Sequence, residues 1–365
     1  MSSHHTLPLP PPPVLYSSEY FNRLLYQDIP SLHMPLTLPD SSLIHHVWEY
    51  KAAPTSSENL VTFDEHIPSM SDIQALLGDI QMAERNGFTV VTVNLRTASG
   101  QEVKSYSVSK IRIMACIHNQ AESIKSASWL FQAVQPESGV LNCPGTAEFF
   151  QDCRIFDPLP GYSSAVPAWT LSCLTMDVDI HYWVIDLAME NLYLRIRTSA
   201  TAGLHPIVLP PLFSIILLHQ YSQPFPRLSN QLSTLSHFIC NFVMLENFSG
   251  LSFLHCNGAH YSTYHYSGNS RLLYGNSLTS APTAEAQQMV SALNWLLPGT
   301  GLPPIIEVSM MDVAFQGGGS CSGGIAALNA LEKLYSLPGI AWHPNNALAL
   351  RYMLMERLLC HAMTV

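Results

Sequence analysis

Residues 316–332 read QGGGSCSGGIAALNALE, a Gly/Ser-rich turn with one cysteine that leads directly into an Ala/Leu-rich segment. Ile325, Leu328 and Leu331 recur at helical spacing, which predicts that a helix begins just after Cys321. The positive end of a helix dipole favours a thiolate over a thiol. The glycines let backbone N–H groups turn toward a developing oxyanion, and Gln316 adds a side-chain donor. The stretch is therefore either half of a cysteine-hydrolase site or a Gly-rich loop with a buried, inert cysteine.

The composition is that of a globular protein with few charges. The chain has 365 residues, 47% hydrophobic and only 12% charged, and its 16 basic and 26 acidic residues give a net charge of -10. Such a balance predicts no basic surface for a phosphate backbone, so we expect no direct contact with nucleic acid.

The cysteines and the apolar runs indicate the cellular compartment of the protein and whether it crosses a membrane. The eight cysteines include no Cys-x-x-Cys pair, which is typical of reduced thiols in an intracellular protein of the nucleus or cytoplasm. The apolar run at residues 212–218 follows Pro206, Pro210 and Pro211 and is far shorter than the roughly 20 residues that a spanning helix needs. We therefore expect a buried helix there and no association with a membrane.

The first 165 residues divide into two predicted regions. Residues 1–65 are rich in Pro, Ser and His without periodicity, which predicts a disordered lead-in. Residues 66–165 predict a small α/β region of unknown role, with a helix that ends near Asn86-Gly87 and strands at 88–95 and 105–113. This region contains no cluster of acid and base side chains, so we assign it no chemistry.

The other half of the predicted site lies in a hairpin within residues 251–278. A strand that contains His260 ends in the turn Ser267-Gly268-Asn269, after which the chain returns toward Asn276. A three-residue turn sets Tyr266 opposite Ser270 and His260 opposite Asn276, so that Asn276 can orient the imidazole. A turn of two or four residues shifts the register by one and separates them.

A zinc site is the alternative for this hairpin. Cys256, His260 and His265 are potential ligands, but their spacing suits neither a closed structural site nor one face of a strand. We expect no metal and no cofactor.

These pieces, taken in order, resemble the catalytic domain of the ubiquitin-like-protein (SUMO) proteases, especially their diverged fungal and transposon-associated branch. His260-Tyr261, the returning segment YGNSL at 274–278, and residues 316–327 are similar to the family's motifs in order and separation. Trp169 and the helix predicted after it resemble the start of the family's domain. The likeness covers about residues 166–362.

The resemblance implies a fold and a reaction. It implies an α+β, papain-like cysteine protease fold with a mixed sheet flanked by helices and the cysteine at a helix N-terminus. It also implies that Cys321 attacks the carbonyl after a Gly-Gly terminus, His260 acts as the general base, Asn276 orients it, and Gln316 stabilises the oxyanion. The expected function is a cysteine-type peptidase or isopeptidase that acts on ubiquitin-like, SUMO-like conjugates or precursors.

Three positions depart from the family pattern. Asn276 replaces an Asp and lacks the charge that stabilises imidazolium, and Tyr261 replaces a Trp. An ungapped match to the family motif Cys-Gly-Ile-Ala places Gly323 at the cysteine's position and Cys321 two residues early. Either the loop brings Cys321 into the site, or the chain is an inactive relative that serves as a protein-binding module or is a mobile-element remnant.

Overall fold

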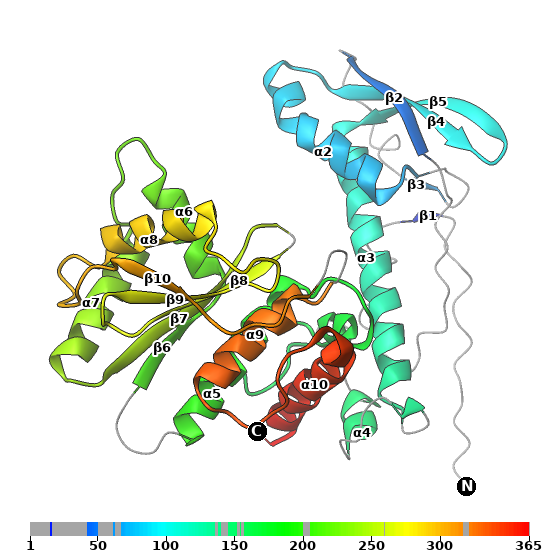
Figure 1. The fold of residues 1–365 in the computed structure, drawn as a ribbon. Helices are drawn as coiled ribbons and strands as arrows, with labels where there is room; N and C mark the ends of the chain where they lie inside the picture. Colours follow the sequence, from blue (N-terminus) through cyan, green and yellow to red (C-terminus); the bar gives the residue numbers. More distant parts are fainter. Residues whose placement is uncertain are drawn as a thin grey trace, which may run out of the picture. The chain divides into compact units, whose positions relative to one another are not determined.

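The computed structural model describes residues 15–16, 42–49, 61–62, 67–135, 138–139, 145–151, 154, 157–199, 205–258, 260–316 and 321–364. The chain divides into two compact units (Figure 1). Residues 1–129 with 151–156 form the N-terminal unit, and residues 130–150 with 157–365 form the C-terminal unit.

The N-terminal unit contains a three-stranded antiparallel sheet of order β2-β4-β5. Its strands are β2 (Ser42–Glu49), β4 (Val90–Thr97) and β5 (Gly100–Ser107), and its helices are α2 (Met70–Arg85) and α3 (Val108–Ala133), of which α3 enters the C-terminal unit at Leu130. Two short strands, β1 (Leu15–Tyr16) and β3 (Val61–Thr62), pair antiparallel.

Two expectations for this unit need correction. The chain becomes helical at Val108, so the strand predicted for 105–113 is wrong beyond residue 107. The Ser107 hydroxyl accepts a hydrogen bond from the backbone N–H of Lys110, and Ile111, Met114 and Ala115 are buried at helical spacing. The prediction of disorder for residues 1–65 is wrong for residues 42–49, which form β2. This strand is held by backbone pairing along β4. The helix predicted to end near Asn86-Gly87 is α2.

The C-terminal unit is built on a mixed five-stranded sheet of order β10-β9-β8-β7-β6. The outer pairs, β10 with β9 and β6 with β7, are parallel, and the two inner pairs are antiparallel. The strands are β6 (His205–Leu209), β7 (Phe248–Cys256), β8 (Tyr261–Tyr266), β9 (Arg271–Gly275) and β10 (Glu307–Met310).

Helices cover both faces of this sheet (Figure 1). α6 (Leu212–Tyr221), α7 (Asn230–Met244) and α8 (Ala284–Leu296) pack on one face around a core that includes Phe253, Tyr264 and Tyr274. α5 (Tyr182–Ser199) and α9 (Gly323–Leu334) pack on the other face, and α10 (Ala347–Thr364) packs against both of them. The remaining short helices are α4 (Thr146–Gln151), η4 (Ala168–Thr175) and η5 (Pro344–Asn346). The unit is thus α+β, with a mixed sheet flanked by helices.

The apolar run at 212–218 is helical as predicted and forms most of α6, but it is buried on one side only: Phe213 and Leu217 lie in the core, whereas Leu212 and Ile215 are exposed. Across the described residues, we find no helix with both the length and the apolar character needed to cross a membrane.

Candidate functional site

The register of the β8–β9 hairpin differs from the predicted one by two residues. Tyr266 pairs with Leu272, not Ser270, because β9 begins only at Arg271 and the turn takes up residues 267–270. Gly268 and Ser270 adopt left-handed φ angles of 83° and 65° in this turn. A shift of two residues keeps each side chain on its face of the sheet, so Asn276 still reaches His260 from the diagonal position.

The structure brings His260 and Asn276 together. Nε2 of His260 lies 2.9 Å from Oδ1 of Asn276, and the backbone N–H of Leu278 donates to the same oxygen over 2.8 Å. The amide nitrogen of Asn276 donates to the Tyr274 hydroxyl over 2.6 Å. Since Oδ1 can only accept, Nε2 of His260 carries the hydrogen, and Nδ1 of the neutral ring carries the free lone pair.

That lone pair faces the start of α9. A Cβ built on Gly323 would lie 2.7 Å from Nδ1 of His260 and 3.2 Å from Cε1. The ring therefore packs against glycine backbone at the position where an ungapped match to the family places the cysteine. In this chain the residue that faces the His260 ring has no side chain.

Cys321 has different neighbours. Its thiol lies within the influence of the carboxylates of Asp179 and Asp177, and its backbone carbonyl accepts from Nη2 of Arg351 over 2.6 Å. Burial, followed by the negative charges of Asp179 and Asp177, raises the pKa of this thiol above its ordinary value. Among the hydrogen bonds of the described residues, none joins Cys321 to His260.

Gln316 lies beside the end of β9. Its backbone N–H donates to the Ser277 carbonyl over 2.8 Å, and its Oε1 accepts from the Ser277 hydroxyl over 2.6 Å. Gln316 is thus bonded to Ser277, the residue that follows Asn276 in the sequence. The Gly-rich turn at 317–320 that follows lies outside the described residues.

The electrostatics favour a neutral His260. Burial lowers the pKa of its imidazole, and the hydrogen bond that it donates to Asn276 and the charge of Glu285 only partly oppose this. The ring can accept a proton at Nδ1 from a group placed there, but Gly323 offers no side chain at that position. No set of three or more His, Cys, Asp and Glu side chains within the described residues is arranged to hold a metal ion.

The sequence did not mark Arg351 as a structural residue. It is 1% exposed, and its guanidinium donates to the backbone carbonyls of Cys173, Met176, Val178 and Cys321 at 2.6–2.8 Å. It thereby fixes the residue before the α9 cap to the segment that precedes α5. The only signal in the sequence is an arginine among the apolar residues of the closing helix, which a solvent-exposed helix face explains equally well.

No protein-family model and no curated protein matches this chain. Several solved structures are similar to part of it. The C-terminal unit is similar to SUMO protease domains. The yeast Ulp1 domain solved in complex with Smt3 is 12% identical, with a TM-score of 0.42 over 54% of this chain and 84% of that one. A second Ulp1 structure is 13% identical, with a TM-score of 0.44 over 57% and 89%.

The Chaetomium thermophilum Ulp1-like SUMO protease domain is also similar, at 12% identity and a TM-score of 0.35 over 50% of this chain and 73% of that one. At these identities and TM-scores the likeness carries no functional argument. The site has to be judged by its own geometry.

Proposed function

We propose that the C-terminal unit binds a ubiquitin-like protein, or a conjugate of one, without hydrolysing it. The observation that carries this proposal is that Nδ1 of His260 lies only 2.7 Å from where a Cβ of residue 323 would be, and residue 323 is glycine. A thiol protease needs a sulfur at hydrogen-bonding distance from its base. Here the base and its orienting Asn276 are in place, and the residue that faces them is glycine.

The surroundings of Cys321 support the absence of turnover. The pKa of its thiol is raised by burial and by the charges of Asp179 and Asp177, whereas a nucleophilic cysteine needs a lowered pKa. A displacement of even about 1 Å from a reactive geometry costs on the order of 100-fold in rate.

The choice of partner rests on the sequence resemblance. His260-Tyr261, Asn276-Ser277, Gln316 and residues 324–329 occur in the order found in the ubiquitin-like-protein proteases. The proposal includes descent within the diverged fungal and transposon-associated branch. It also includes an intracellular location, in the nucleus or cytoplasm, which the free thiols of Cys116, Cys173 and Cys240 support.

The test combines covalent trapping with equilibrium binding. The probe is SUMO whose C-terminal Gly-Gly carries a vinyl electrophile, and the proteins are wild type, Cys321→Ser and, as a control for exposed thiols, Cys360→Ser. We expect no adduct on Cys321 and the same dissociation constant for unmodified SUMO with wild type and Cys321→Ser.

Two results contradict the proposal in different ways. An adduct on Cys321 that disappears in His260→Gln would establish a cysteine peptidase and overturn the non-hydrolytic assignment. Failure of SUMO and ubiquitin to bind in calorimetry at concentrations up to about 1 mM, where a specific interaction is still measurable, would overturn the choice of partner.

A further inference from the structure

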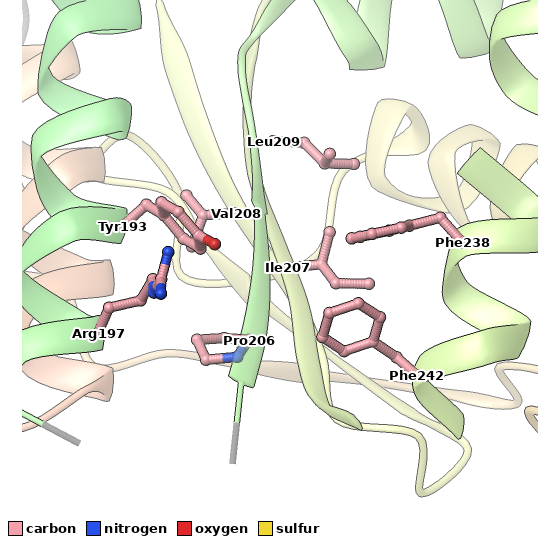
Figure 2. A pocket seen from close by; sticks show the side chains of 8 residues that line it. All are labelled: Tyr193, Arg197, Pro206, Ile207, Val208, Leu209, Phe238 and Phe242. Atoms are coloured by element: carbon pink, nitrogen blue, oxygen red, sulfur yellow. The ribbon is translucent and has the colours of Figure 1, made fainter. Parts of the chain in front are cut away.

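A groove follows the outer edge of the central sheet of the C-terminal unit (Figure 2). It has a volume of about 410 Å³ and lies along β6, with α5 on one side of the strand and α7 on the other. β6 is the last strand of the sheet, and no other described strand pairs with its outer edge. An unpaired edge with walls on both faces is a receptor for an added strand.

The two walls differ in chemistry. Phe238 and Phe242 of α7 form an aromatic wall next to Ile207, with their ring centroids 4.6 Å apart. Phe238 is 46% exposed, so its face is available to a ligand. On the opposite side of the strand the wall is formed by Tyr193 and Arg197, with the guanidinium 5.7 Å from the centre of the tyrosine ring.

Arg197 gives the groove a charge preference. It is exposed, and no carboxylate among the described residues forms an ion pair with it, whereas its neighbour Arg195 is paired with Glu332. A carboxylate that reaches Arg197 makes a charge-assisted hydrogen bond without displacing an existing partner.

The edge itself fixes the register of an added strand. Pro206 and Pro210 bound the stretch Ile207–Leu209, and the pairing of β6 with β7 shifts between His205 and Ile207. Proline has no N–H to donate, so only the three residues between the prolines offer a regular backbone edge. Such a short edge admits few alternative alignments.

We propose that this groove binds an extended acidic peptide segment of a partner protein as a sixth strand beside β6. Side chains of a strand alternate between the two faces. Two apolar residues that flank one acidic residue therefore place the apolar side chains against Phe238 and Phe242 and the carboxylate against Arg197. This inference goes beyond the proposed function and does not depend on it.

The test begins with a phage-displayed library of random ten-residue peptides, selected against the full chain. We expect enrichment of apolar–acidic–apolar triplets. The most enriched sequence is then synthesised with a fluorophore, and its binding is measured by anisotropy to wild type, Arg197→Glu and Phe238→Ser. Each groove variant is expected to weaken binding about tenfold, the effect of losing one good contact.

Matched control variants distinguish binding in the groove from nonspecific electrostatic or hydrophobic binding elsewhere on the surface. Arg227→Glu makes the same charge change outside the groove, and Phe225→Ser removes a phenylalanine that is 87% exposed. Neither is expected to change binding. A peptide with lysine in place of the acid should bind Arg197→Glu better than wild type, and N-methylation of the peptide backbone on the side facing β6 should abolish binding.

Three results would overturn the inference. These are a selection without any enriched motif, a peptide that binds Arg197→Glu and Phe238→Ser as tightly as wild type, and a peptide unaffected by N-methylation. A second copy of the chain as the occupant would appear as a dimer in light scattering that Phe238→Ser dissolves, and that result would also exclude a partner peptide.

Discussion

Nδ1 of His260 lies so close to Gly323 that a Cβ built on the glycine would be 2.7 Å from it. Real Cβ atoms are not found at such a distance from a ring nitrogen. The first residue of α9 and the β8 strand are therefore packed for a glycine. The close approach of the His260 ring to the backbone of Gly323 leads to a first prediction.

Replacement of Gly323 by alanine is expected to destabilise the C-terminal unit by about 1–3 kcal/mol, because the added methyl group overpacks the contact with His260. Urea unfolding of the single and double variants with His260→Ala tests this. If the ring is the obstacle, the double variant recovers part of the loss, and the coupling energy is of the order of 0.5–3 kcal/mol.

Gly78 provides the matched control for this substitution. It lies within α2, and nothing is within 4 Å of a Cβ built on it. Gly78→Ala should therefore stabilise the protein by roughly 0.5–1 kcal/mol, the helix preference for alanine. A Gly323→Ala variant as stable as Gly78→Ala would show that the contact with the ring does not exist in solution.

Asn276→Asp is expected to raise the pKa of His260 by about one unit or more. A carboxylate at this position accepts the Nε2 hydrogen and also stabilises the protonated ring by its charge, which the neutral amide does not do. An NMR titration of the Cε1 proton measures the change. An unchanged midpoint would mean that residue 276 does not touch the imidazole in solution.

The reactivity of Cys321 should depend on Asp179 and not on His260. Burial and then the two aspartates hold the pKa of the thiol above its ordinary value. Asp179→Asn removes one of these charges, so the pH midpoint for alkylation by iodoacetamide should fall, with mass spectrometry of the Cys321 peptide as the readout. His260→Gln is expected to leave the midpoint unchanged. A higher midpoint in His260→Gln would instead place the imidazole beside the thiol.

Arg351→Met is expected to cost about 3 kcal/mol or more of unfolding free energy. The substitution leaves four buried backbone carbonyls without their donor. Arg271→Met, which removes an exposed pair with Glu307, is the control and should cost less than about 1 kcal/mol. Equal losses for the two variants would argue against a structural role for Arg351.

The sequence was sufficient for the parts of the site that depend on short-range periodicity. The helix after Cys321 and the shared face of His260 and Asn276 follow from spacings of 3.6 and 2 residues. The hairpin register was wrong by two residues because a sequence of polar turn formers does not specify how many of them the turn uses. The error left the face unchanged, since the side-chain pattern of a strand repeats every two residues.

Local sequence patterns did not predict the long-range contacts of the site. Whether Cys321 or Gly323 faces His260 depends on the path of the loop before α9, and the sequence left both possibilities open. Arg351 contacts carbonyls more than 170 residues earlier in the chain, at Cys173 and Met176, so no local periodicity marks it. The segment after Ser107 alternates apolar and polar residues over a short range, which fits a strand as well as the helix that forms.

A last prediction concerns pH and His265. This residue is 5% exposed, and its Nδ1 lies 2.7 Å from the Ser252 hydroxyl. Burial lowers its pKa from 6.5 to about 4. Between these values the unfolded chain binds a proton that the folded chain excludes, so the stability is complete above about pH 6.5 and falls as the pH drops toward 4.

The expected loss is on the order of 3 kcal/mol over this interval, at about 1.4 kcal/mol per pKa unit. Urea unfolding at pH 7, 5.5 and 4.5 measures it. Burial also lowers the pKa values of His181 and His260, so their contributions have the same sign and must be subtracted. His265→Gln provides that subtraction: it should be less stable at pH 7 but lose less stability on acidification. If the two proteins lose stability in parallel, His265 titrates normally and its ring is accessible to water.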